Sequence, residues 1–147
     1  MKMNPESDWW FAEARKDGVK HYVRARRVAD VATLAVELPI LMVITWQYAG
    51  NAEGMPPNES TIEKMDRFEN LLVGGVEEVG IAVKTSCVTG AGQRIWNYYA
   101  HNADSFREAM RLALANQPPF PIEVEAVDDP GWLSIKKLNA NLRKGGH

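Results

Sequence analysis

The stretch TGAGQRIWNYYA, residues 89–100, is the part of the sequence closest to a chemical motif, because it combines glycines, an arginine and three aromatic residues. A dinucleotide-binding loop would need a third glycine followed by a helix, and a P-loop would need Gly-Lys-Ser/Thr. Neither pattern is present, and the residues after the glycines are typical of a strand. We therefore predict a turn in which Gly90 and Gly92 supply positive φ angles between two antiparallel strands.

The strand after this turn carries three candidate binding residues. Alternation along a strand places Arg94, Trp96 and Tyr98 on one face of the sheet. One face of the strand must pack on helices, and the other could form an exposed aromatic platform that stacks bases or grips a peptide. We favour burial of both faces, the second under the N-terminal hairpin or a partner subunit, because aromatic-rich strands mostly lie in the core.

A short basic cluster, RARR at residues 24–27, contributes two more candidate binding residues, Arg24 and Arg26. If the cluster lies on a strand, alternation divides its charges between the two faces and leaves a weak phosphate-binding surface. The alternative is a solvated sheet edge whose charges prevent unwanted strand pairing.

The sequence contains no evident catalytic or metal-binding constellation. His21, His101 and His147 stand apart, without the spacing of zinc ligands, and the single cysteine, Cys87, has no neighbouring base. The acidic pair at residues 128–129 precedes a proline and is better explained as a helix cap than as an acid–base pair. We therefore assign no catalytic residue, no metal ligand and no cofactor.

The composition favours an ordinary cytoplasmic domain. The chain has 147 residues, 46% of them hydrophobic, and a formal net charge of -2, which argues against a dedicated nucleic-acid-binding protein. The longest apolar run, residues 34–46, is too short to span a bilayer and contains Glu37 and Pro39. The first residues lack the apolar core of a signal peptide.

Turn and capping signals divide the chain into strands and helices. Asp17-Gly18 predicts a hairpin between two strands, Ser60 and Glu63 form a capping box at a helix start, and Asn102 caps a second helix. Strands are expected near residues 40–49, 80–88, 93–100 and 122–127. A last helix is expected to be capped by Asp129, with the following proline in its first turn.

The order of these elements predicts an α+β fold. From residue 40 to residue 127 it is strand, helix, strand, strand, helix, strand, which is typical of a ferredoxin-like two-layer sandwich. We interpret the chain as a single domain, 1–147. Residues 1–39 form the N-terminal hairpin and its lead-in, 40–127 the ferredoxin-like core, and 128–147 the C-terminal helix and tail. The hairpin should extend the sheet or cover one edge, and the C-terminal helix should lie against an edge or a second chain.

Short motifs occur in a fixed order along nearly the whole chain: an aromatic N-terminal hairpin, a Gly-x-Arg-x-Trp-x-Tyr strand and an Asp-Pro-x-Trp element. The positions are Trp10, Phe11, Gly92, Arg94, Trp96, Tyr98, Tyr99, Asp129, Pro130 and Trp132. Together they resemble the domain-of-unknown-function family 695. Trp132 is our sixth candidate binding residue.

The resemblance implies no assigned activity. Some members of that family are fused to a domain similar to the regulator of ribonuclease E activity B, which acts by binding the enzyme, so the resemblance implies regulation or protein binding. The segment LSIKKLNANLRK departs from the family, whose members tend to have more aromatic residues there.

Three hypotheses about function follow from the sequence. We favour a non-catalytic binding or regulatory module that acts through contacts with a protein partner or another copy of the chain, without a membrane. The second is a small hydrolase or nucleic-acid-processing enzyme, which would need Arg94, His21 or the acidic pair at 128–129 to converge in one cleft. The third, an RNA-binding regulator, would use the basic cluster together with Trp96 and Tyr98.

Overall fold

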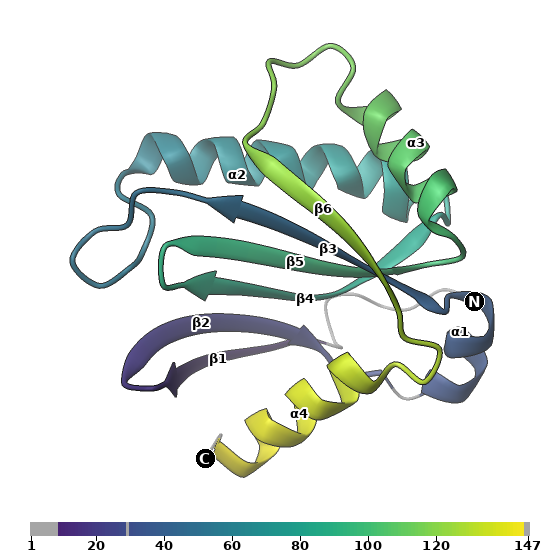
Figure 1. Ribbon diagram of the computed structural model, residues 1–147, viewed down its shortest axis with the longest axis horizontal. Coiled ribbons are helices and arrows are strands. Elements are labelled where there is room, and N and C mark those ends of the chain that lie inside the picture. The colour runs from purple at the N-terminus through teal and green to yellow at the C-terminus, as the bar shows by residue number, and fades with distance from the viewer. Residues whose placement is uncertain (1–8, 29, 146–147) are drawn as a thin grey trace.

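The computed structural model describes residues 9–28 and 30–145; residues 1–8 and the end of the predicted tail, 146–147, lie outside the described part. A six-stranded antiparallel sheet forms its centre (Figure 1). Along the chain, the strands are β1 (Trp9–Lys16), β2 (Val19–Arg26), β3 (Ile40–Gln47), β4 (Ala82–Gly90), β5 (Gln93–Ala100) and β6 (Ile122–Asp128). The sequence therefore correctly predicted a mixed α+β fold.

Four α-helices occur in the described residues: α1 (Val31–Glu37), α2 (Glu59–Leu72), α3 (Ala103–Ala113) and α4 (Leu133–Gly145). A π-helical turn, η1 (Val73–Glu77), extends α2 at the position of the two consecutive glycines. Within residues 9–28 and 30–145, none of the helices combines the length and the apolar character needed to cross a bilayer.

The strands lie in the order β1-β2-β4-β5-β3-β6. The order differs from that of the four-stranded ferredoxin-like sheet expected from the sequence. Strand β2 pairs with β4, and β1 pairs with β2, so β1 is the edge strand. The hairpin thus extends the sheet, which was one of the two arrangements expected from the sequence. Because β2 pairs with β1 on one side and β4 on the other, Arg24 lies on an inner strand and not at an open edge of the sheet.

Helices cover both faces of the sheet, so the expectation of two layers was too simple (Figure 1). Alternate residues of β3 and β5 pack under α2, η1 and α3 on one face. On the other face, Trp132 and Ile135 of the C-terminal segment pack with Tyr99 of β5 and Leu34 of α1. Helix α4 therefore lies on a face of the sheet, whereas an edge or a second chain was expected, because its apolar residues pack on a second apolar sheet surface there.

The helix starts are set by asparagine caps. The Asn102 side chain accepts a hydrogen bond from the Ser105 backbone N–H at 2.7 Å, which confirms the predicted cap of α3. Helix α2 begins earlier than predicted: Asn58 accepts from the Thr61 N–H at 2.9 Å, so Asn58, not Ser60, is the cap. Asn58 is extended, and it follows two prolines that cannot continue a helix.

Each of the two hairpin turns contains two consecutive residues with positive φ angles. Asp17 and Gly18 have φ angles of 54° and 80°, which confirms the first predicted turn. In the second turn Ala91 and Gly92 take positive φ, at 53° and 81°. The expectation for Gly90 was wrong: a Cβ there would lie 2.6 Å from the Lys20 carbonyl oxygen, so glycine allows the close approach of β2.

Candidate functional site

Two of the six candidate binding residues, Arg24 and Arg94, line one hollow on the α2 side of the sheet. The hollow has a volume of about 360 Å³ and lies between β2, β4, β5 and the start of α2. We call it the arginine hollow; its lining consists of Tyr22, Arg24, Met55, Pro56, Ile62, Cys87, Thr89 and Arg94. It combines two guanidinium groups with an apolar wall.

Arg94 is held in the hollow by neutral groups. Its Nε donates a hydrogen bond to Thr89 Oγ1 at 2.8 Å, and its guanidinium carbon lies 6.0 Å from the centre of the Trp96 ring. Among the described residues, no carboxylate pairs with Arg94. Because Arg94 is half-buried, this uncompensated positive charge faces a partly desolvated space, where an anion would be attracted more strongly than in water.

Arg24 belongs to a group of charges beneath the hollow, which we call the charge cluster: Arg24, Glu69, Glu77 and Lys84. Arg24 binds Glu69 with both ends of its guanidinium group, at 2.6 and 3.2 Å. Lys84 Nζ lies 3.4 Å from Glu69 and 3.9 Å from Glu77. Side chains from β2, β4, α2 and η1 thus meet in one ionic network.

Glu69 is the centre of this network. Burial alone would raise the pKa of its carboxyl group, but hydrogen bonds from Arg24, the charges of Lys84 and Arg24, and a hydrogen bond from Trp96 lower that pKa to about 2. The Trp96 indole N–H donates to Glu69 Oε1 at 2.7 Å. Glu69 is therefore ionised at neutral pH, and it fixes the orientation of Arg24 at the wall of the hollow.

At the Glu77 end of the charge cluster, some buried polar atoms have no hydrogen-bond partner in the described part of the chain. Burial raises the pKa of Glu77, against the opposing effect of Lys84. One oxygen of Glu77 and the hydroxyl group of Tyr98 are buried without a hydrogen-bond partner in the described part of the chain. Burial raises the pKa of Tyr98 well above its ordinary value, and the charges of Glu77 and Glu69 add to the increase.

The loop between β3 and α2 supplies the apolar wall of the hollow through Met55 and Pro56. The loop is docked on the second hairpin: the Tyr48 hydroxyl group and the Gly92 N–H both donate to the Gly54 carbonyl, at 2.8 and 2.9 Å. Asn51 Oδ1 accepts from the Met55 N–H at 3.1 Å. These contacts hold the wall in place without a ligand.

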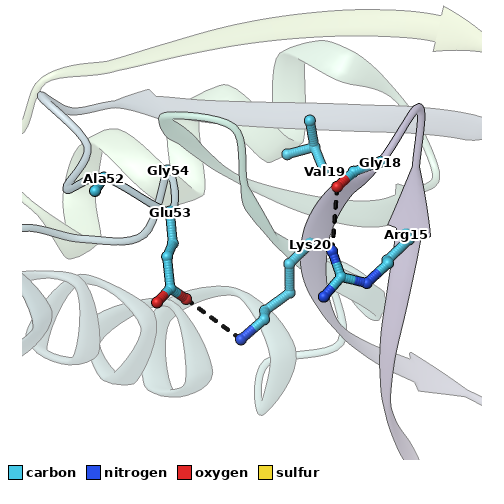
Figure 2. Close-up of a pocket in the computed structure, with 7 residues that line it drawn as sticks. All are labelled: Arg15, Gly18, Val19, Lys20, Ala52, Glu53 and Gly54. Carbon is cyan, nitrogen blue, oxygen red and sulfur yellow. Dashed lines mark hydrogen bonds and ion pairs between the residues drawn. The ribbon is translucent and has the colours of Figure 1, made fainter.

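A second hollow, of about 490 Å³, lies on the other side of this loop, against the first hairpin turn (Figure 2). Lys20 crosses it and pairs with Glu53 at 3.3 Å, and the Arg15 guanidinium group donates to the Gly18 carbonyl at 3.1 Å. Lys20 also pairs with Glu13. Because Lys20 is paired with Glu13 and Glu53, and Arg15 is bonded to the turn itself, we interpret this hollow as the junction that ties the hairpin to the loop and not as the candidate site.

We expect Gly54→Ala to destabilise the protein more than Gly80→Ala. Both glycines have a φ of +79°, where an alanine costs about 1–2 kcal/mol of backbone strain. At Gly54, the added Cβ would also lie 3.0 Å from the Ala91 backbone nitrogen, whereas at Gly80 it would meet nothing within 4 Å. Urea unfolding of both variants measures the difference. Equal losses would show that the loop is not docked as described.

The remaining candidate binding residues do not form an exposed surface. Trp96 and Tyr98 are fully buried, so the aromatic platform that a nucleic acid could stack on is absent, and both rings belong to the core under α2 and α3. Arg26 is buried with its guanidinium group 4.8 Å from the Trp9 ring centre. Trp132 is buried on the opposite face of the sheet, stacked on Tyr99.

The comparisons with known proteins concern the same region. A family model described as "Family of unknown function (DUF695)" matches residues 7–135. This chain belongs to DUF695. The match confirms the resemblance expected from the sequence, and it contains the whole arginine hollow and the charge cluster. No curated protein and no solved structure matches the chain significantly.

The residues that could have served a hydrolytic enzyme are separated in this DUF695 fold. His21 lines a groove on the face of the sheet opposite the arginine hollow. Asp129 accepts a hydrogen bond from Tyr99 at 2.6 Å and caps α4 through the Leu133 and Ser134 N–H groups. The predicted cap is thus present, although the helix begins only at Leu133. The described residues contain no group of three side chains suited to hold a metal ion.

The sequence did not reveal Glu69, Glu77 or Lys84 as parts of the candidate site. Glu69 lies at the border of the apolar stripe of α2, where the helical pattern fits either Phe68 or Glu69. Lys84 occurs within a strand that is otherwise mostly buried. A charged residue in a buried stripe is the signal that could have indicated an internal ion pair. The partner of Glu69, Arg24, lies 45 residues away in the chain and could not be inferred.

Proposed function

We propose that this DUF695 protein is a non-catalytic, regulatory binding module that recognises an acidic, partly apolar segment of a partner protein in the arginine hollow. The observation that carries the proposal is the position of Arg94, whose guanidinium group lines the hollow without a carboxylate partner in the described residues. A carboxylate of the partner supplies that missing charge and accepts hydrogen bonds from the guanidinium group.

The surroundings of the hollow support a peptide as its occupant. Tyr22 and Ile62, which line it, are 48% and 38% exposed, and Phe11, opposite Arg24 in the neighbouring strand, is 74% exposed. These side chains form an apolar rim beside a positive charge. A segment that alternates acidic and apolar side chains complements both features.

Nucleic acid is the less favoured partner. The two aromatic residues that the sequence offered for stacking on bases, Trp96 and Tyr98, are fully buried, so only Tyr22 and Phe11 of the rim present exposed rings. Two of the cations near the hollow, Arg24 and Lys84, are already compensated by Glu69 and Glu77, and the chain as a whole has a formal net charge of -2. A second copy of the chain is the alternative protein partner.

We also propose that β3 to β6, with α2 and α3, form a ferredoxin-like unit, to which the N-terminal hairpin adds two strands. In support, β3 lies between β5 and β6 and is antiparallel to both, and β5 pairs with β4. A cytoplasmic location is consistent with the unpaired, buried thiol of Cys87.

Binding of a short synthetic peptide of alternating glutamate and leucine, measured by isothermal titration calorimetry at low salt, tests the proposal. We expect Arg94→Gln to weaken binding about tenfold, the effect of losing about 1.5 kcal/mol from a hydrogen bond to a charged group. Arg94→Gln should unfold at the same urea concentration as the wild type, because Arg94 is only half-buried and forms no ion pair.

The matched control is Arg107→Gln, which removes an equal charge from an exposed position on α3. Its peptide affinity should equal that of the wild type. The same peptide with glutamine in place of each glutamate should not bind. Equal weakening by the two variants, binding of the glutamine peptide, or preferential binding of single-stranded oligouridylate would contradict the proposal.

A further inference from the structure

The opposite face of the sheet carries a groove of about 790 Å³ whose lining includes a row of apolar side chains. Its floor is formed by β1, β2, β4 and β5, and residues of α4 form one wall. This groove and the arginine hollow share no residue. We propose that it binds a small amphipathic anion, with an apolar body and one carboxylate, as a second site independent of the proposed peptide site.

The shape of the groove follows from small residues on the sheet. Ala12 and Ala14 of β1 leave space on this face that larger side chains would fill, whereas Gly90 of β4 lies directly beneath the His21 ring. Val88 and Ile95 continue the apolar floor across the sheet. The volume lies within the range of roughly 300–1,000 Å³ that small-molecule sites occupy.

Leu138 of α4 closes one side of the groove with an apolar side chain. Three side-chain amides line the groove, those of Gln93, Asn97 and Asn141, and Asn97 Nδ2 is already anchored because it donates to Ser86 Oγ at 2.8 Å. The body of a ligand therefore meets mainly carbon atoms. Burial of an alkyl chain there contributes about 0.8 kcal/mol for each methylene group removed from water.

Positive charge is concentrated at the end of the groove near the first hairpin turn. The register pairs Lys16 with Val19 and Ala14 with His21, which places Lys16 and His21 on the groove side of the hairpin. Among the described residues, Lys16 takes part in no ion pair or hydrogen bond. The His21 Nδ1 lies 3.1 Å from the Val19 carbonyl and donates to it, which holds the imidazole ring at this end of the groove.

The other charged groups at this end do not cancel that of Lys16. Glu13 borders the groove, but its carboxylate is paired with Lys20 at 3.2 Å. Arg15 also borders the groove and adds a further positive charge. A ligand with its carboxylate at Lys16 and its chain along Ala14 and Val88 is complementary to the groove in both charge and polarity.

Decanoate, at submicellar concentration, is the probe. Titration followed by ¹H–¹⁵N NMR should shift the amide resonances of Val23, Val88 and Ile95, and decyltrimethylammonium at the same concentration should not. Lys16→Glu should weaken decanoate binding about tenfold or more, because one charge-assisted contact becomes a repulsion. Ala14→Phe, which fills the groove, should abolish binding; Ala12→Leu is the second filling variant if Ala14→Phe does not fold.

Arg107→Glu is the matched charge control, and it should bind decanoate like the wild type. Arg94→Gln should also bind normally, so failure of the peptide site and failure of this site are distinguishable. Equal shifts with the cationic amphiphile, unchanged binding to folded Ala14→Phe, or shifts spread over the surface would overturn the proposal. A dimer in sedimentation that folded Ala14→Phe dissociates would show that a second copy covers the groove, and it would overturn the proposal as well.

Discussion

Replacing Glu69 with alanine should lower the free energy of unfolding by about 3–5 kcal/mol, the usual cost of removing one partner from a buried ion pair. The loss follows because Arg24 and Lys84 would both remain beneath α2 without the carboxylate that they share. The Trp96 indole N–H would lose its acceptor at the same time. Urea unfolding, followed by tryptophan fluorescence, measures the change.

The surface pair of Glu108 and Arg111 is the matched control. It has the same two-point geometry, at 2.6 and 3.0 Å, but both side chains are exposed. Glu108→Ala should therefore barely change the urea midpoint, because solvent screens exposed pairs. If the two alanine variants were equally stable, the ionic network of Glu69 would contribute nothing specific to the fold.

The pH dependence of stability gives a second readout for Glu69. Its pKa is lowered from 4.5 in the unfolded chain to about 2 in the folded protein. Its contribution is therefore complete above pH 4.5 and is lost as the pH falls from 4.5 to 2. Glu77 acts in the opposite direction, because burial raises its pKa in the folded state. Glu69→Gln should flatten the acid limb of the stability curve, and an unchanged limb would contradict the assignment.

Replacing Trp132 with alanine should lower the free energy of unfolding by about 3–5 kcal/mol, as for other large buried aromatic residues. The Trp132 ring stacks on Tyr99 with a centroid distance of 4.2 Å and an angle of 14°, and its indole N–H donates to the Leu38 carbonyl at 2.7 Å. These contacts attach the start of α4 to the sheet. Urea unfolding, with near-ultraviolet circular dichroism for the stacked rings, measures the effect.

Two further variants separate the contributions at this position. Trp132 has a φ of 53°, so Trp132→Gly should be less destabilising than Trp132→Ala by about 1 kcal/mol, although it also loses the ring. Leu133, its neighbour, is 68% exposed, and Leu133→Ala should change stability by no more than about 0.5 kcal/mol. A loss at Trp132 as small as that at Leu133 would mean that α4 is not anchored by this ring.

Local signals in the sequence were sufficient for much of the fold. The Asp17-Gly18 turn, the Asn102 cap and the alternating strands each depend on residue types only a few positions apart in the sequence, and each occurs in the structure. The pairing of β2 with β4 joins segments that are far apart in the chain, and no local signal determines it. The same is true of α4, whose apolar stripe would fit a sheet face, an edge or a second chain equally well.

The candidate site shows the same division. Arg24 and Arg94 could be selected from their residue types, but their meeting in one hollow depends on the β2–β4 register and on the loop that carries Met55. For Trp96 and Tyr98 the sequence favoured burial and left an exposed aromatic platform as the alternative; both are buried, because α2 and α3 cover that face. Burial of a strand face is decided by the tertiary packing, which alternation alone does not specify.

Side-chain NMR of the hollow during titration with the glutamate–leucine peptide tests most directly whether an acidic segment binds at Arg94. The Arg94 side chain lines the hollow, and the buried Trp96 indole N–H, bonded to Glu69, belongs to the charge cluster beneath it; the indole N–H of Trp132 lies on the opposite face of the sheet. We expect the Arg94 and Trp96 signals to shift together and to saturate, while the Trp132 signal stays in place. Saturable binding that leaves the Arg94 signal unmoved, or that moves Trp132 equally, would contradict the proposed site.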